Sequence, residues 1–292
     1  MKLLLLGKNG QVGWELQRAL APLGELIALD SQDADFAQPE SLAATVRAVA
    51  PDIIVNAAAY TAVDKAESEP ALAMAVNATA PAVLAREAAA LGAWLLHFSS
   101  DYVFDGSGIT PWVEDSPTGP LNVYGRSKLE GEQVIRASGC RHLILRTSWV
   151  YAARGGNFAK TMLRFAAERE QLSVVNDQFG APTGADLLAD IAAHALRTAL
   201  ARPQVSGTYH VAAAGETSWH GYAQRVIEFA RVAGRPLKVT DDAITAVPSS
   251  AFPTPARRPA NSRLNTQKFR DTFGLSLPAW QAGVERMLTE LE

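Results

Sequence analysis

Short, continuous apolar runs alternate with helical patterns through the first half of the chain. The runs carry few polar residues, which is typical of strands buried on both faces of a parallel sheet. The expected strands lie in KLLLL, LIALD, DIIVNAA, WLLHFSS and HLILRTSWV. The helices predicted between them cover residues 11–21, 39–49, 69–92 and 124–138. This repetition of strand and helix predicts an α/β fold with a doubly wound parallel sheet.

The pattern loosens after Val150. Amphipathic helices are predicted at residues 157–170, 185–200 and 277–291. We therefore expect a larger first domain and a smaller, irregular C-terminal α/β domain that binds the substrate. The expected boundaries are 1–150 for the first domain, which also takes in part of 176–212, and 151–292 mainly for the second.

Prolines and alanines crowd the segment from Ala243 to Arg263, which excludes regular structure throughout. Two interpretations stay open, a flexible linker or an ordered loop. Its adjacent Arg257 and Arg258 suit either a bidentate grip on an anion or a salt bridge to the main domain.

Composition narrows the function class. The 292 residues are 48% apolar and 20% charged with a net charge of −3, so the chain lacks the basic surface that a nucleic-acid partner requires. No apolar run has the length of a membrane span, and four leucines followed by glycine are too short for a signal peptide. A single cysteine, Cys140, excludes an internal disulfide and fits a cytoplasmic location.

A glycine turn joins the first strand to the first helix. Gly7, Gly10 and Gly13 give the spacing GxxGxxG, where glycines allow a tight turn and let backbone N–H groups approach a pyrophosphate at the helix N-terminus. Asp30 ends the second strand, where a carboxylate can accept hydrogen bonds from the adenosine ribose, which favours NAD. Lys8 either attracts the 2′-phosphate of NADP or stays solvated, so the choice between NADH and NADPH stays open.

Two further segments fit a Rossmann-type cofactor site. Asp35 and Phe36 lie where the loop after the second strand can cover an adenine. Ala59, Tyr60 and Thr61 follow the third strand, where small residues let a flat cofactor lie close to the backbone.

The segment YGRSK, residues 124–128, offers a candidate pair for proton transfer. Tyr124 and Lys128 are four residues apart, so on a helix they share one face. We expect the ammonium to lower the pKa of the phenol, which would let Tyr124 exchange a proton with a carbonyl oxygen. Ser100, at the carboxyl end of the preceding strand, adds a hydroxyl to the site, whereas His97 on the same strand is expected to be a core residue.

Over essentially its full length the chain resembles the extended short-chain dehydrogenase/reductase family. The motifs that carry the resemblance are GKNGQVGWELQ, VNAAAYTAVDKAE, SSDYVFDG, NVYGRSKLEGE, RTSWVYA, NFAKTML, NDQFGAPTGA and TPARRPANSRLN. The resemblance implies reduction of a keto group on a nucleotide-linked sugar by NADPH or NADH.

The resemblance also implies roles for individual residues. It makes Tyr124 the proton donor and Lys128 its cofactor-bound partner, and it places Ser100, Asp101 and Trp149 against the sugar. Family members commonly have threonine where Ser100 stands, which keeps the hydroxyl. The implied cofactor contacts are Gly10, Gln11 and Val12 at the pyrophosphate, Asp30 at the ribose, Asp35 and Phe36 at the adenine, and Ala59, Tyr60 and Thr61 at the centre.

A homodimer with magnesium at the contact is a further implication, and its candidate ligands are Glu15 and Asp186. Two other functions stay open. One is a nucleotide-sugar epimerase or dehydratase of the same fold, although dehydratases of this family need an acidic pair where Asp101 is followed by Tyr102. The other is a non-catalytic, cofactor-binding regulatory subunit.

Overall fold

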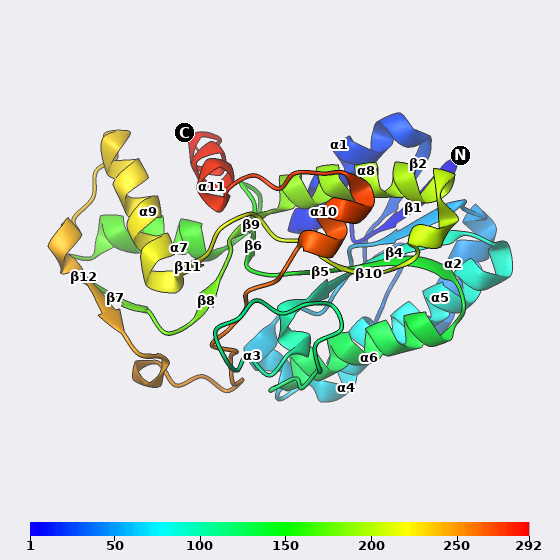
Figure 1. The fold of residues 1–292 in the computed structure, drawn as a ribbon, viewed down its shortest axis with the longest axis horizontal. Coiled ribbons are helices and arrows are strands. Elements are labelled where there is room, and N and C mark those ends of the chain that lie inside the picture. Colours follow the sequence, from blue (N-terminus) through cyan, green and yellow to red (C-terminus); the bar gives the residue numbers. More distant parts are fainter. Residues whose placement is uncertain (292) are drawn as a thin grey trace.

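The computed structural model describes residues 1–291 and contains a six-stranded parallel sheet with the strand order β10-β5-β4-β3-β1-β2 (Figure 1). These strands are β1 (Lys2–Leu6), β2 (Glu25–Leu29), β3 (Ile53–Asn56), β4 (Trp94–Ser100), β5 (Arg141–Thr147) and β10 (Gly207–His210). The predicted doubly wound α/β fold is confirmed. The order reverses between β1 and β3, which is the switch point where such sheets bind ligands.

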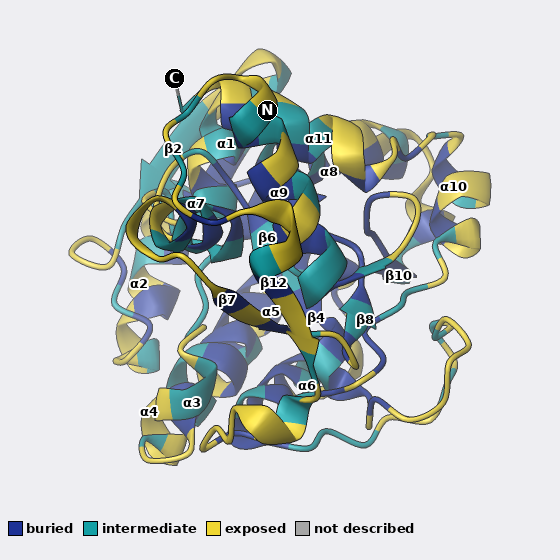
Figure 2. Cartoon of the chain, turned by 90° about the vertical axis from the view of Figure 1, so that its left-hand side faces the viewer, coloured by how far each residue is buried: buried dark blue, intermediate teal, exposed yellow. Residues whose placement is uncertain are grey.

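Helices cover both faces of the sheet. One face carries α1 (Gln11–Leu20), α8 (Ala185–Ala201) and α10 (Gln267–Phe273), and the other carries α2 (Pro39–Val49), α5 (Ala80–Leu91) and α6 (Val123–Ala137) (Figure 1). Side chains of β1 alternate between the two cores, with Leu3 and Leu5 in one and Leu4 and Leu6 in the other. In Figure 2 the interior segments are mostly dark blue, the colour of buried residues, whereas the outer loops are mostly yellow.

The single helix predicted at residues 69–92 is interrupted. It consists of α4 (Pro70–Met74), a π-helical turn (Ala75–Thr79) and α5, and it follows the short helix α3 (Val63–Ala66). Within the turn the Asn77 amide is fully paired: its oxygen accepts from the Tyr60 backbone N–H at 2.9 Å, and its nitrogen donates to the Tyr60 carbonyl and the Ser127 hydroxyl, both at 3.0 Å. The π-turn therefore ties the loop after β3 to helix α6.

A second group of elements lies beside the sheet and shares its own apolar core (Figure 1). Its helices are α7 (Phe158–Glu168), α9 (Trp219–Val232) and α11 (Trp280–Thr289). Three two-stranded sheets complete it: β7 (Leu172–Val175) with β12 (Ile244–Val247), β6 (Val150–Tyr151) with β9 (Thr183–Gly184), and β8 (Phe179–Gly180) with β11 (Thr217–Ser218). Helices α8 and α10 pack instead in the core around β1, and the boundary at residue 150 stays a prediction.

The proline-rich segment makes fixed contacts at both ends. It contains β12 and the 3₁₀ turn Ser249–Ala251, where the Ser249 backbone N–H donates to Asp177. Further along, the Asn122 amide donates to the Arg257 carbonyl at 2.8 Å. The ordered-loop interpretation is therefore confirmed over the flexible linker. The remaining 3₁₀ turns are Ala21–Leu23, Asp101–Val103, Pro203–Val205 and Asp241–Ala243.

Within residues 1–291, no helix combines the length and the apolar character needed to cross a membrane.

Candidate active site

Two adjoining clefts open at the carboxyl ends of β1, β3 and β4, with volumes of about 320 and 480 Å³. Gly10, Ala57 and Ala59 line both clefts, so the two adjoin, and together they are called the channel below. The outer cleft, of about 320 Å³, is lined by Gly7 of the glycine turn and by the residues predicted for the adenosine end, Asp30, Asp35 and Phe36. The inner cleft, of about 480 Å³, brings together eight residues of the predicted site: Gln11, Val12, Thr61, Ser100, Asp101, Tyr124, Lys128 and Trp149.

The glycine turn makes room for this channel. Gly7 has a φ of +86°, and a Cβ there would meet the backbone of Ala57 and Ala58 within 3.0 Å. Gly13 lines neither cleft. It is buried against the glycine turn, where a Cβ would collide with the Gly7 carbonyl oxygen. Its role is to let α1 pack against the turn. The open backbone at this helix N-terminus fits a pyrophosphate.

Asp30 sits at the outer end within a small charged cluster. Its carboxylate accepts from the Gln32 backbone at 2.9 Å and the Asn9 amide at 3.1 Å, and Lys8 Nζ lies 3.3 Å away. Lys8 Nζ also lies 3.4 Å from Asp33, so Lys8 is ion-paired. The hydrogen bond from Gln32 is the main cause that lowers the Asp30 pKa.

Tyr60 departs from the prediction. Its side chain lines neither cleft and packs against a small apolar cluster of Ala66, Ala73 and Val123. Its hydroxyl donates to Glu69 at 2.6 Å. The ring and the hydroxyl of Tyr60 thus have their partners away from the cleft, next to the three alanines Ala57 to Ala59 that line it.

Ser100 and Asp101 end β4 inside the inner cleft. The Ser100 hydroxyl donates to Asp101 Oδ1 at 3.0 Å and accepts from the Tyr102 backbone at 3.2 Å. Asp101 is 2% exposed, and burial raises its pKa to about 6. His97 is buried and pairs with the Asn56 amide at 3.0 Å, which confirms that it is a core residue.

Tyr124 and Lys128 lie on α6, and both line the inner cleft. Burial raises the Tyr124 pKa to about 12, partly offset by the Ser100 hydroxyl. Lys128 Nζ donates to the Phe98 carbonyl at 2.7 Å, and burial lowers its pKa to about 8. The predicted lowering of the phenol pKa by the ammonium is therefore wrong for this structure, because desolvation of the buried phenol sets the direction of the shift.

Trp149 lines the inner cleft in an unusual backbone conformation. Its φ is +50°, a strained value for a bulky residue, and its ring stacks on Trp219 with centroids 3.7 Å apart. Trp219 also lines the inner cleft. The sequence did not predict this, because no motif around Trp219 distinguishes it from a tryptophan of the core. Asn77 lines neither cleft but holds the loop after β3, and a polar side chain within an alanine-rich helix is a usable signal for such a role.

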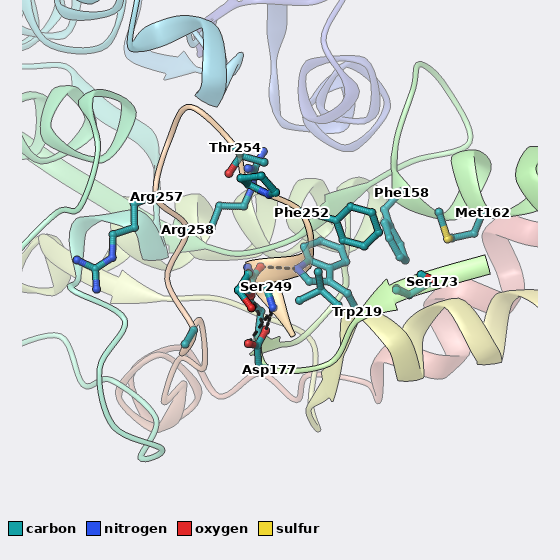
Figure 3. Close-up of a pocket in the computed structure, with 16 residues that line it drawn as sticks. Phe158, Met162, Ser173, Asp177, Trp219, Ser249, Phe252, Thr254, Arg257 and Arg258 are labelled. Carbon is teal, nitrogen blue, oxygen red and sulfur yellow. Dashed lines mark hydrogen bonds between the residues drawn. The ribbon is translucent and has the colours of Figure 1, made fainter. Parts of the chain in front are cut away.

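A further cavity of about 630 Å³ lies between the C-terminal elements and the proline-rich loop. Figure 3 shows Phe158, Trp219 and Phe252 grouped together, with Arg257 and Arg258 apart from them. Trp219 lines this cavity as well as the inner cleft, so the two adjoin. Arg258 makes the predicted salt bridge to the main domain, 2.8 Å from Asp64, while Arg257 has no ion-pair partner within residues 1–291.

The proposed magnesium ligands are neighbours but do not form a complete site. The carboxylates of Asp186 and Glu290 raise the Glu15 pKa, to which burial contributes most. Glu15 and Asp186 face Arg18 at 3.7 Å and Arg286 at 3.6 Å respectively. No group of three metal-ligating side chains is arranged to hold an ion in the described part of the chain. An ion at a contact between two copies of the chain stays a prediction, and no catalytic step is assigned to a metal.

This fold, with hydroxyl and ammonium groups at the inner end of a channel suited to a dinucleotide, defines the class: the chain is an NAD(P)H-dependent oxidoreductase with a Rossmann fold. It belongs to the family described as the RmlD substrate binding domain, which it matches over residues 1–292.

Known relatives support this membership. The chain is 60% identical to the dTDP-4-dehydrorhamnose reductase of Escherichia coli K12 over 100% of this chain and 98% of that protein. A crystal structure of a dTDP-4-dehydrorhamnose reductase from Clostridium acetobutylicum matches with a TM-score of 0.90 and 34% identity, covering 100% and 99% of the two chains. The Bacillus anthracis enzyme in complex with NADP matches with a TM-score of 0.88 and 34% identity, covering 99% of each chain.

Proposed function

We propose that this protein reduces the C4 keto group of dTDP-4-dehydro-L-rhamnose with NADH or NADPH and yields dTDP-L-rhamnose. The observation that carries the proposal is the pair of adjoining clefts that extends from Asp30 to Tyr124, with the glycine turn at one end and a candidate proton donor at the other. The full-length similarity to dTDP-4-dehydrorhamnose reductases supports the choice of substrate.

The cofactor would lie along this channel. Its pyrophosphate would meet the backbone of Gly10, Gln11 and Val12, and its adenosine would lie near Asp30 and Asp35. Bound there, the nicotinamide supplies the hydride. Lys128 would bond the adjoining ribose from the floor of the inner cleft.

Tyr124 is assigned the proton transfer. A phenol with a pKa of about 12 is fully protonated at neutral pH, so the proton is present when negative charge develops on the sugar oxygen. Ser100 lies beside it and would hold that oxygen by a hydrogen bond. The buried Lys128 ammonium would stabilise the phenolate left behind, which requires the lysine to stay charged.

The substrate nucleotide is assigned to the cavity beside Trp219. Phe158 and Phe252 offer apolar surface to a base, and the Arg257 guanidinium suits a diphosphate. Trp149 would then contact the sugar where this cavity meets the inner cleft. A domain division near residue 150 agrees with this placement of two ligands on two groups of elements.

The direct test is oxidation of NADH or NADPH at 340 nm in the presence of dTDP-4-dehydro-L-rhamnose. Tyr124→Phe should lower turnover by about 10²–10⁴-fold, the usual range for a lost general acid, with cofactor affinity nearly unchanged. Tyr209→Phe is the matched control, because its hydroxyl bonds the Val205 carbonyl away from both clefts. A Tyr124→Phe enzyme with most of its turnover would exclude the assigned role.

A homodimer and a cytoplasmic location complete the proposal. Analytical ultracentrifugation and cell fractionation test them separately from the catalytic assignment.

A further inference from the structure

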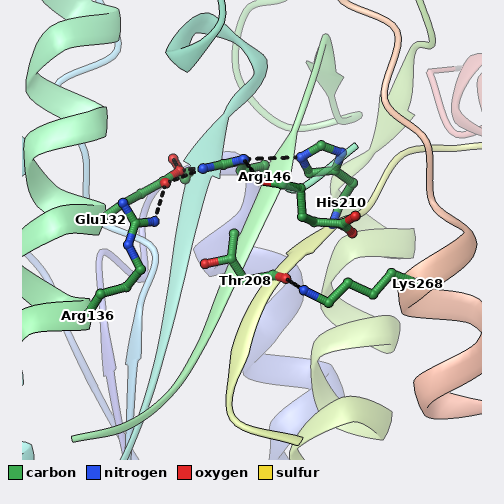
Figure 4. Close-up of polar contacts among 8 residues, drawn as sticks. Glu132, Arg136, Arg146, Thr208, His210 and Lys268 are labelled. Carbon is green, nitrogen blue, oxygen red and sulfur yellow. Dashed lines mark hydrogen bonds and ion pairs between the residues drawn. The ribbon is translucent and has the colours of Figure 1, made fainter. Parts of the chain in front are cut away.

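Glu132 is a fully buried carboxylate for which the proposed reaction has no direct use. It lies on α6, one helical turn after Lys128, and its side chain is 0% exposed. Ser99 Oγ donates to it at 2.6 Å, and Arg146 donates through Nε at 2.8 Å and Nη2 at 2.7 Å (Figure 4). Arg136 adds a hydrogen bond at 2.9 Å. Charges are buried at high cost, so this group needs an explanation.

The partners of Glu132 adjoin the proposed catalytic residues. Ser99 directly precedes Ser100 on β4, and Arg146 precedes Thr147 on β5, close to Trp149. The sheet register pairs Ser99 with Arg146 and Ser100 with Thr147. Through one carboxylate, α6 is therefore fixed to the two strand ends that shape the inner cleft.

Arg146 is itself held from several sides. Its Nη1 donates to the Glu114 carbonyl at 3.1 Å and lies 3.4 Å from His210 Nε2, and its guanidinium lies 5.1 Å from the Phe104 ring centre. Burial lowers the His210 pKa to about 3, so that imidazole is neutral. Arg146 thus has Glu132 as its charge partner, and Figure 4 shows the guanidinium between Glu132 and His210.

The surroundings of Lys128 give the carboxylate a second effect. On α6, Glu132 acts on the charge of Lys128 and Tyr124 lines the same cleft, while His97 and the Phe98 carbonyl face Lys128 from β4. Burial lowers the His97 pKa well below its usual value, so His97 is neutral. Glu132 is then the carboxylate that opposes the desolvation of the Lys128 ammonium.

We propose that Glu132 is a positioning residue that keeps Lys128 charged and holds α6 against β4 and β5, and that Arg146 makes its burial possible. This inference rests on the proposed function only through the role of Lys128. It differs from a purely structural role, in which the buried pair stabilises the fold and any well-packed replacement is equivalent.

Two variants separate these roles. Glu132→Gln removes the charge but leaves Arg146 buried and unpaired, which strongly destabilises proteins. The double variant Glu132→Gln with Arg146→Met removes both charges, a replacement that is often neutral for stability. Glu87→Gln is the matched control, because Glu87 is also buried and bonded twice by an arginine, Arg47, at 2.6 and 2.8 Å, but lines neither cleft.

The decisive readout is the pH dependence of NADH binding, followed by cofactor fluorescence without any sugar. In the native protein the affinity for NADH should fall as pH rises through the Lys128 pKa of about 8, which gives the binding profile a descending limb there. In Glu132→Gln this limb should move to lower pH, because Arg146 keeps its charge when the carboxylate is lost, and turnover at pH 7.5 should fall by about tenfold or more. In the double variant, which loses one charge of each sign, the limb should move in the same direction by a smaller amount. Glu87→Gln should leave both unchanged.

An unmoved limb in a folded double variant overturns the proposal, whatever its turnover. A moved limb together with native unfolding stability supports it. If the native protein binds NADH with this limb but does not oxidise it with the sugar, the proposed substrate fails while the inference about Glu132 is still decided.

Discussion

Replacing Gly131 by alanine probes how closely α6 must approach the π-turn. A Cβ at Gly131 would point at the Asn77 carbonyl oxygen, almost an ångström inside the 3.0 Å that Cβ contacts need. The obstacle is backbone, and Asn77 is fixed through its own side chain to Tyr60 and Ser127. Helix α6 therefore has to shift, and it carries Tyr124 and Lys128 with it.

Two free-energy terms compete in Gly131→Ala. Alanine in a helix interior is worth about 1 kcal/mol over glycine, whereas overpacking a tight contact costs about 1–3 kcal/mol. Since the clash is with backbone, we expect the second term to win and the free energy of unfolding to fall by up to about 2 kcal/mol. A displacement near 1 Å at the site should lower kcat by about 10- to 100-fold.

Urea unfolding and cofactor oxidation at 340 nm measure the two effects. Gly156→Ala is the control, because a Cβ there meets nothing within 4 Å and the position has no positive φ. A Gly131→Ala protein that is more stable than the native one, with unchanged kcat, would refute the claim that this contact sets the position of α6.

Two other predictions concern charge. Lys8→Ala removes the cation that lies 3.3 Å from Asp30 and 3.4 Å from Asp33. Because the two carboxylates should then repel the 2′-phosphate, kcat/KM for NADPH should fall about tenfold more than kcat/KM for NADH. Equal losses for the two cofactors would contradict this. The pKa of Asp101 is raised to about 6, so the native protein loses free energy of unfolding as pH rises from about 4 to 6 and this carboxyl ionises. Asp101→Asn cannot ionise, so over that window its free energy of unfolding should rise by up to about 3 kcal/mol relative to the native protein. Parallel plots of unfolding free energy against pH, measured with urea, would contradict this.

The sequence predicted the central sheet well because its signals are local. Continuous apolar runs such as KLLLL can be satisfied only between two helical layers, and the structure buries Leu3 to Leu6 in this way. The glycine turn could also be predicted from the sequence, because few other residues allow the backbone to pack as tightly as it does at Gly7 and Gly13.

The features that were missed depend on long-range contacts. The π-turn at Asn77 arises from partners 17 and 50 residues away. The direction of the Tyr124 pKa shift depends on how deeply α6 is buried, which spacing alone does not give. Trp219 reaches the site because α9 packs beside Trp149, a contact between segments 70 residues apart in the sequence.

The central claim is hydride transfer to C4 of the sugar with a proton from this chain. The most direct measurement supplies NADH carrying deuterium in the transferred position, together with dTDP-4-dehydro-L-rhamnose, and locates the label in the product by NMR. The account predicts dTDP-L-rhamnose with deuterium at C4, formed by the native protein and almost absent with Tyr124→Phe. Product without deuterium at C4, or label at another carbon, would contradict it.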